Sequence, residues 1–64
     1  MKIRIKTYNG KLPSYLTVGK VYEYKELKSY CGLVLVDNGL EYFTYLNGSA
    51  HLNGGSWEVV SERI

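Results

Sequence analysis

Glycine-containing turns divide this chain into short, tyrosine-rich apolar runs, and this spacing limits the folds that the chain can adopt. Asn-Gly or Gly-Gly pairs stand at residues 9–10, 38–39, 47–48 and 54–55. In a chain of 64 residues, strands this short can enclose a core only if their sheet curls on itself. The pattern therefore predicts an all-β fold, a small five-stranded antiparallel barrel that occupies residues 1–64 as one domain.

The first two strands are predicted from the alternation of apolar and charged residues. Residues 1–6 place two isoleucines on one face and basic residues on the other. Residues 20–25 place Tyr22 and Tyr24 on one face, which we expect to point inward. Residues 24–30 also fit a helical spacing, so a short helix there is an alternative to a longer strand.

The remaining strands follow from the turns that separate them. Residues 33–36 form the most apolar run, which is typical of a central strand covered on both faces. The Asn-Gly turn after it predicts a hairpin whose second strand is 40–46. The fold can include one short helical turn at 49–52 before the last strand, 56–60, and a short tail, 61–64, follows.

Aromatic residues supply much of the apolar area available to this chain. It contains seven tyrosines, one phenylalanine and one tryptophan, Trp57, which we place in the core. A buried tyrosine needs a hydrogen-bond partner for its hydroxyl group, so several tyrosines should lie at the surface. This leaves an aromatic surface available to a partner.

The single cysteine and the absence of a long apolar run indicate the compartment. Cys31 has no second cysteine with which to form an internal disulfide, which favours a reducing, cytoplasmic setting, and we expect its thiol to be buried or half-buried. No run is long enough to cross a bilayer, and the N-terminus alternates charged and apolar residues unlike a signal peptide. We therefore expect a cytoplasmic protein that is mature from Met1 and does not associate with a membrane.

Few residues suit catalysis or metal binding. The chain has one histidine, His51, and one aspartate, Asp37, and no serine lies in a nucleophile-elbow pattern. Cys31 and His51 lack the spacing of a zinc site, and the 37–39 segment stops after one acid where a calcium loop needs several. We therefore expect a non-enzymatic protein without a metal or cofactor, in which His51 is a loop residue that hydrogen-bonds its neighbours.

A long first loop, residues 7–19, leads into the second predicted strand. The segment that spans this junction is Tyr15-Leu16-Thr17-Val18-Gly19-Lys20-Val21-Tyr22-Glu23. Together with the Asp37-Asn38-Gly39 turn and the Trp57-Glu58-Val59 ending, this segment resembles small SH3-like barrels, in particular small phage and bacterial proteins of that kind. The resemblance implies a phage-type accessory protein that docks onto another molecule. SH3 domains that bind proline-rich peptides carry acids in the first loop, whereas this loop carries Lys11 and no acid.

Two binding functions remain open from the sequence. The first is docking onto a host or partner protein through an aromatic and basic surface, for which loops, aromatics and arginine are the best candidates: Arg4, Tyr8, Lys11, Tyr15 and Tyr30. The alternative is binding of nucleic acid by a basic face, Lys2, Arg4 and Lys6, with stacked tyrosines. The net charge of +2 is modest, but residues 1–28 hold seven of the eight basic residues. The sequence is compatible with a monomer and with a homodimer in which the edge strands of two sheets pair.

Overall fold

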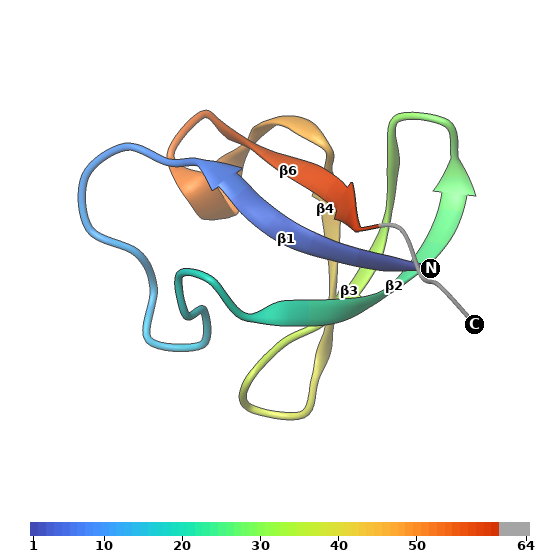
Figure 1. Cartoon of the computed structure of the whole chain (residues 1–64), viewed down its shortest axis with the longest axis horizontal. Helices are drawn as coiled ribbons and strands as arrows, with labels where there is room; N and C mark the ends of the chain where they lie inside the picture. The colour runs from blue at the N-terminus through green and yellow to red at the C-terminus, as the bar shows by residue number, and fades with distance from the viewer. Residues whose placement is uncertain (61–64) are drawn as a thin grey trace.

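Six antiparallel strands and one 3-10 turn form a small, nearly closed barrel in the computed structural model, which describes residues 1–60 (Figure 1). The all-β prediction is confirmed, and the strand count of five is too low by one short strand. The predicted tail, 61–64, lies outside the described residues. The elements are β1 Lys2–Thr7, β2 Val21–Lys28, β3 Cys31–Leu35, β4 Glu41–Tyr45, β5 Asn47–Ser49, η1 Ala50–Leu52 and β6 Gly55–Val60.

The strand order is β4-β3-β2-β1-β6-β5, so most neighbours in the sheet are also neighbours in the chain. The exception is the pairing of β1 with β6, which places Ile5 opposite Trp57 and Arg4 opposite Glu58. This pairing brings the two halves of the chain together and puts β1 between β2 and β6. A register shift between Ile5 and Thr7 bends the end of β1, as bulges do in small barrels.

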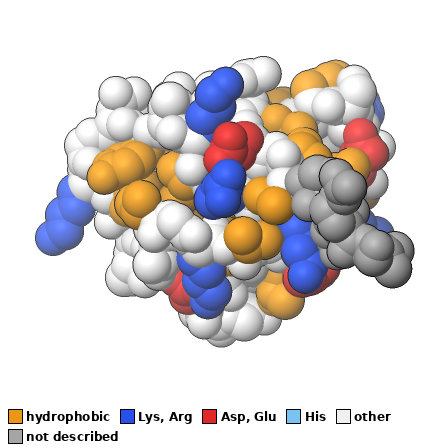
Figure 2. All heavy atoms as spheres, in the orientation of Figure 1, with side chains coloured by type: hydrophobic (Ala, Val, Ile, Leu, Met, Phe, Trp, Pro, Cys, Tyr) orange, Lys and Arg blue, Asp and Glu red, His pale blue; other side chains and the backbone are white. Residues whose placement is uncertain are grey.

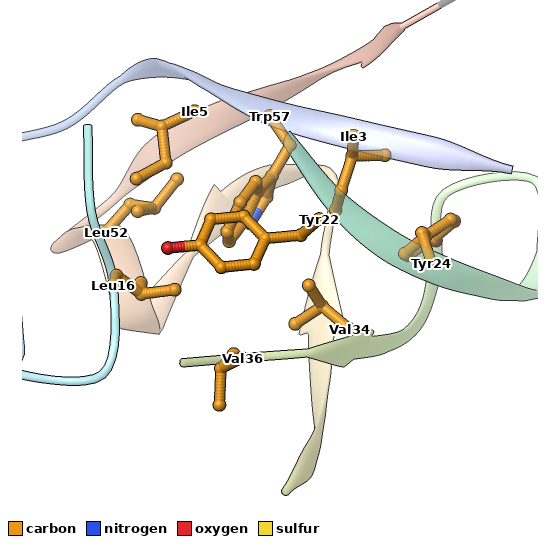
Figure 3. Close-up of a cluster of buried hydrophobic side chains, with 9 residues drawn as sticks. All are labelled: Ile3, Ile5, Leu16, Tyr22, Tyr24, Val34, Val36, Leu52 and Trp57. Atoms are coloured by element: carbon orange, nitrogen blue, oxygen red, sulfur yellow. The ribbon is translucent and has the colours of Figure 1, made fainter. Parts of the chain in front are cut away.

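The inward faces of the strands form one core (Figure 3). Tyr22, Tyr24 and Trp57 are buried, as predicted, and the rings of Tyr22 and Trp57 meet edge to face at 6.0 Å between centroids. Because the sheet curves, residues from strands and loops distant in sequence converge on these rings. The buried cluster is Ile3, Ile5, Leu16, Tyr22, Tyr24, Val34, Val36, Leu52 and Trp57.

The structure contradicts two predictions about the middle of the chain. Residues 33–36 were expected to be covered on both faces, but Val34 and Val36 are buried while Leu35 is 40% exposed. The expectation is wrong because a single curved sheet has no second layer on its outer face. The helical alternative for 24–30 is also wrong, since β2 continues as a strand to Lys28. The helical turn is confirmed as η1, and Cys31 is buried with a free thiol.

Buried side chains join the two ends of the strand order, β4 and β5. The indole Nε1 of Trp57 donates to Thr44 Oγ1 at 3.1 Å, and the hydroxyls of Thr44 and Ser49 lie 2.7 Å apart. Thr44 and Ser49 are almost completely buried. The backbone N–H of Trp57 also donates to the carbonyl of Leu46, between β4 and β5. We call Thr44, Ser49 and Trp57 the seam network, because they connect the edges that would otherwise be open.

The long loop between β1 and β2 is held against the β3–β4 turn by Asp37. The carboxylate of Asp37 accepts hydrogen bonds from Lys20 Nζ at 2.6 Å, from Thr17 Oγ1 at 2.7 Å and from the hydroxyl of Tyr22 at 3.2 Å. The Lys20 ammonium, followed by the Thr17 hydroxyl, holds the pKa of Asp37 below its ordinary value. The loop is therefore tied to the barrel by a group whose charge depends on pH.

We expect the Asp37→Asn variant to be less stable than the wild type near neutral pH, and the difference to shrink in acid. A carboxyl whose pKa is lowered by folding stabilises the fold above its unfolded-state pKa, and this contribution is lost as the pH falls through the folded-state pKa. Urea unfolding at about pH 6 and about pH 3 measures the change. Glu41→Gln, at an exposed carboxylate on β4, is the control. A stability difference for Asp37→Asn that is equal at both pH values would contradict the role of its charge.

Candidate functional site

The five residues proposed from sequence as a partner surface do not lie together. Tyr8 and Lys11 lie on the loop that follows β1, whereas Tyr30 lies in the turn between β2 and β3. Figure 1 shows this loop, in light blue, and this turn, in green, at opposite ends of the molecule. Arg4 is on β1 between them, and Tyr15 is further along the loop. The structure therefore offers separate surfaces, which have to be judged one by one.

The basic face of β1 is largely neutralised by acids on the neighbouring strands. Arg4 Nε lies 2.8 Å from Glu58 on β6, and Lys2 Nζ lies 3.4 Å from Glu23 on β2. Basic and acidic side chains accordingly lie next to one another on the face shown in Figure 2. Lys6 is exposed at the end of the strand. Two of the three cations proposed for binding nucleic acid thus already have carboxylate partners.

Tyr15 is half-buried and forms a small aromatic cluster instead of standing free. Its hydroxyl lies 2.7 Å from His51 Nδ1, and its ring meets that of Tyr42 edge to face at 4.8 Å between centroids. His51 Nε2 lies 2.9 Å from the carbonyl of Phe43, which can only accept, so Nε2 carries the proton and Nδ1 accepts from Tyr15. Desolvation, and then the neighbouring Tyr42, raise the pKa of Tyr15. His51 thus forms hydrogen bonds, as predicted, but it lies in η1 and its partners are 36 and 8 residues away in the chain.

Three exposed aromatic rings lie in contact on the outer face of β4 and the adjacent turn. Tyr30, Phe43 and Tyr45 are 52%, 48% and 47% exposed. The rings of Tyr30 and Tyr45 are parallel, with centroids 6.2 Å apart, and Phe43 meets Tyr45 edge to face at 5.2 Å. We call these three residues the aromatic patch. They form a continuous surface because β4 alternates, with Thr44 buried between the two outward-facing rings.

The strands beside the aromatic patch add apolar and basic residues to it. Across β3, Phe43 lies opposite Leu33, which in turn lies opposite Lys25 on β2. Tyr45 lies opposite Cys31, which is buried, and Cys31 lies opposite Lys28 across a register shift between Glu26 and Lys28. Paired residues on neighbouring strands project on the same face of a sheet, so Lys25 lies on the face of the patch, and Lys28 is exposed at the end of β2, two residues before Tyr30. The surface is therefore apolar in its centre and basic along one side.

Side-chain donors protect the free edge of β4. The even-numbered residues here form the hydrogen-bonded pairs with β3, as the bond from the Leu46 N–H to the Tyr30 carbonyl shows. In an antiparallel pair the residues between them point their backbone groups the other way, so those of Phe43 and Tyr45 face the free edge. The Phe43 carbonyl on this edge accepts from His51, and the Tyr45 carbonyl accepts from Thr44 Oγ1 at 3.1 Å. A strand from a second molecule would have to displace these donors to pair with β4.

Sequence reasoning anticipated Tyr30 but missed Phe43 and Tyr45. The available signal was the Tyr-Phe-Thr-Tyr run in 40–46, because a strand directs alternate residues to opposite faces and cannot bury all three rings in one core. The alternation alone does not show which face is inward. Only the pairing of β4 with β3 resolves that question.

The described part of the chain has neither a pocket for a small molecule nor a cluster of metal ligands. Residues 1–60 form no pocket, and no group of three or more His, Cys, Asp or Glu residues among them is placed to hold a metal ion. In the same range, no helix is long and apolar enough to cross a membrane. Comparisons of the chain with models of protein families, with curated proteins and with solved structures find no match.

Proposed function

We propose that this protein is a non-enzymatic binding module that docks onto a partner protein through the aromatic patch. In this proposal it is an SH3-like barrel and a phage-type accessory protein that acts in the cytoplasm as a monomer. The observation that carries the proposal is the contact among Tyr30, Phe43 and Tyr45, three rings that are each about half exposed on one surface. Contiguous exposed apolar surface on a small protein marks an interaction site more often than scattered apolar residues do.

The physical properties of the patch suit a protein interface. Aromatic rings bury a large area while losing few rotamers, and tyrosine is enriched among the residues that dominate binding energy. Tyr45 contacts both Tyr30 and Phe43, so part of the ordering that binding requires is already present in the free protein. The β4 strand beneath the patch is paired along its length with β3, which gives the rings a firm support.

The same geometry gives less support to nucleic-acid binding. Lys2 and Arg4 have carboxylate partners, so a phosphate would have to compete with Glu23 and Glu58 for them. Bases stack on free ring faces, whereas part of the Tyr45 ring is already in contact with Tyr30 and Phe43. A protein partner is therefore the function that we favour.

We expect the Phe43→Thr/Tyr45→Thr double variant to lose the partner that the wild-type protein retains from a lysate. Threonine keeps the β-strand preference of these positions, so the change removes the rings with little effect on the strand. Loss of central aromatic anchors costs about 2 kcal/mol or more, which is about thirtyfold in affinity. The measurement is a tagged pull-down with and without nuclease, with circular dichroism and thermal unfolding to show that the variant is folded.

Tyr8→Thr is the matched control, because Tyr8 is 43% exposed and belongs to the loop after β1, which lies at the opposite end of the molecule from the β2–β3 turn (Figure 1). It should retain the partner as the wild type does. Equal retention by the folded patch variant would contradict the proposal. Recovery of nucleic acid, with the proteins lost after nuclease treatment, would favour the alternative function instead.

A further inference from the structure

Within residues 1–60, three of the seven basic side chains form ion pairs and four, Lys6, Lys11, Lys25 and Lys28, do not; two of these four lie near the aromatic patch. Three cations have acidic partners on neighbouring segments, and each of these ion pairs has an N–O distance of 3.4 Å or less. These pairs are Lys2 with Glu23, Arg4 with Glu58, and Lys20 with Asp37. Cross-strand pairing of opposite charges is a normal way to satisfy the outer face of a sheet.

Lys25 and Lys28 differ from these cations, because neither has a carboxylate opposite it. Lys25 lies opposite Leu33, and Lys28 lies opposite Cys31. No ion pair connects either lysine with an acid in residues 1–60. Both are exposed: Lys25 lies on the face of the patch through Leu33 and Phe43, and Lys28 lies two residues before Tyr30, where β2 ends. Two positive charges thus remain available at the side of an apolar surface.

The nearest acids along these strands have other positions or partners. Glu23 lies on the same face of β2 as Lys25, but it pairs with Lys2 at 3.4 Å. Glu26 lies opposite Gly32, and adjacent residues of a strand project on opposite faces, so its side chain lies on the other face of the hairpin from Lys25. Glu41 shares the outer face of β4 with the patch, but it lies opposite Leu35, at the end of the strand away from Tyr45. The patch therefore has lysines on the β2 side and a carboxylate, Glu41, at one end.

We infer that the aromatic patch binds an acidic segment of its partner protein, with apolar side chains on the three rings and carboxylates beside Lys25 and Lys28. This inference rests on the proposed function and specifies the chemistry of the partner. Opposite charges at the rim of an interface fix the register of the partner and accelerate encounter, while the apolar centre supplies most of the affinity. Glu41 repels acids from the other end, so the segment binds in one direction.

The test uses a random-peptide library displayed on mRNA and selected on immobilised wild-type protein. We expect the selected peptides to be enriched in Asp and Glu next to apolar residues. The affinity of the most enriched peptide should fall about tenfold or more in Lys25→Glu/Lys28→Glu, consistent with loss of about 1.4 kcal/mol or more. Lys6→Glu/Lys11→Glu makes the same change in net charge away from the patch and should retain affinity.

The outcomes separate this inference from the proposed function. Peptides that lose binding in Phe43→Thr/Tyr45→Thr but show no acidic enrichment, or that tolerate Lys25→Glu/Lys28→Glu, overturn the acidic partner and leave the patch as a protein-binding site. A selection that yields no patch-dependent peptide overturns both. Tighter binding of a random-sequence single-stranded DNA than of the best peptide, measured with the same variants, also overturns the inference in favour of nucleic acid.

Discussion

Replacing Gly55 with alanine is expected to remove most of the stability of this fold. A Cβ atom at Gly55 would overlap the carbonyl oxygen of Thr7, and it would lie 2.7 Å from the Thr7 carbonyl carbon and 2.7 Å from Tyr8 Cα. These are backbone atoms, which cannot rotate away as the end of a side chain can. The end of β1 could move only by breaking its contacts with the start of β6, including the Thr7–Ser56 pairing.

The expected loss is about 3 kcal/mol, the upper end of the range for overpacked sites. A single small core rarely provides more than about 3–5 kcal/mol in total, so the variant should retain about 2 kcal/mol or less and unfold at a much lower urea concentration than the wild type. Urea unfolding followed by tryptophan fluorescence measures this change, because Trp57 is buried in the core and is the only tryptophan.

Gly48→Ala is the matched control for this variant. Gly48 has a φ of +67°, and a Cβ there would meet no atom within 4 Å, so alanine at this position adds backbone strain without overlap. We expect a loss of about 1–2 kcal/mol from that strain. If Gly55→Ala unfolds at the same urea concentration as Gly48→Ala, the close approach of β6 to Thr7 does not limit the fold.

Local sequence patterns predicted the parts of the fold that depend on neighbouring residues. The alternation around Tyr22 and Tyr24 placed these rings inside, and the Asn38-Gly39 turn occurs where positive φ was expected, at +84° for Gly39. The three-residue strand β5 was missed because a segment this short shows no periodicity. It is a strand only because β6 pairs with it.

The candidate site depends on contacts that no local pattern contains. Tyr30 and Tyr45 meet because β3 and β4 pair in one particular register, which is not visible in either segment alone. Arg4 looked like an available cation, but its carboxylate partner is 54 residues away. Tyr15 looked like an exposed loop residue, but its partner His51 is 36 residues away. The residue types therefore predicted an aromatic and basic surface, whereas the topology determines which aromatic residues lie together.

Thr44→Val is expected to have the second large effect, because it removes one hydroxyl from the seam network without changing the shape of the side chain. The Thr44 hydroxyl has one proton, which it donates to the Tyr45 carbonyl, so Ser49 donates to Thr44 and the Trp57 indole donates to it as well. Valine would leave the Ser49 and Trp57 donors buried without an acceptor. Each such buried group costs about 1–3 kcal/mol, so the two together should cost about 2 kcal/mol or more.

Thr44→Ser separates the hydroxyl from the methyl group at the same position. Serine keeps the acceptor and loses one buried methyl group, which costs about 1 kcal/mol. Valine is the more apolar and the better strand former, so hydrophobicity and strand preference both predict that Thr44→Val is the more stable variant. The seam network predicts the opposite order, and urea unfolding of the two variants decides between them. Faster hydrogen exchange at the Trp57 amide in Thr44→Val than in Thr44→Ser would locate the loss at the seam, since this amide donates to Leu46 between β4 and β5.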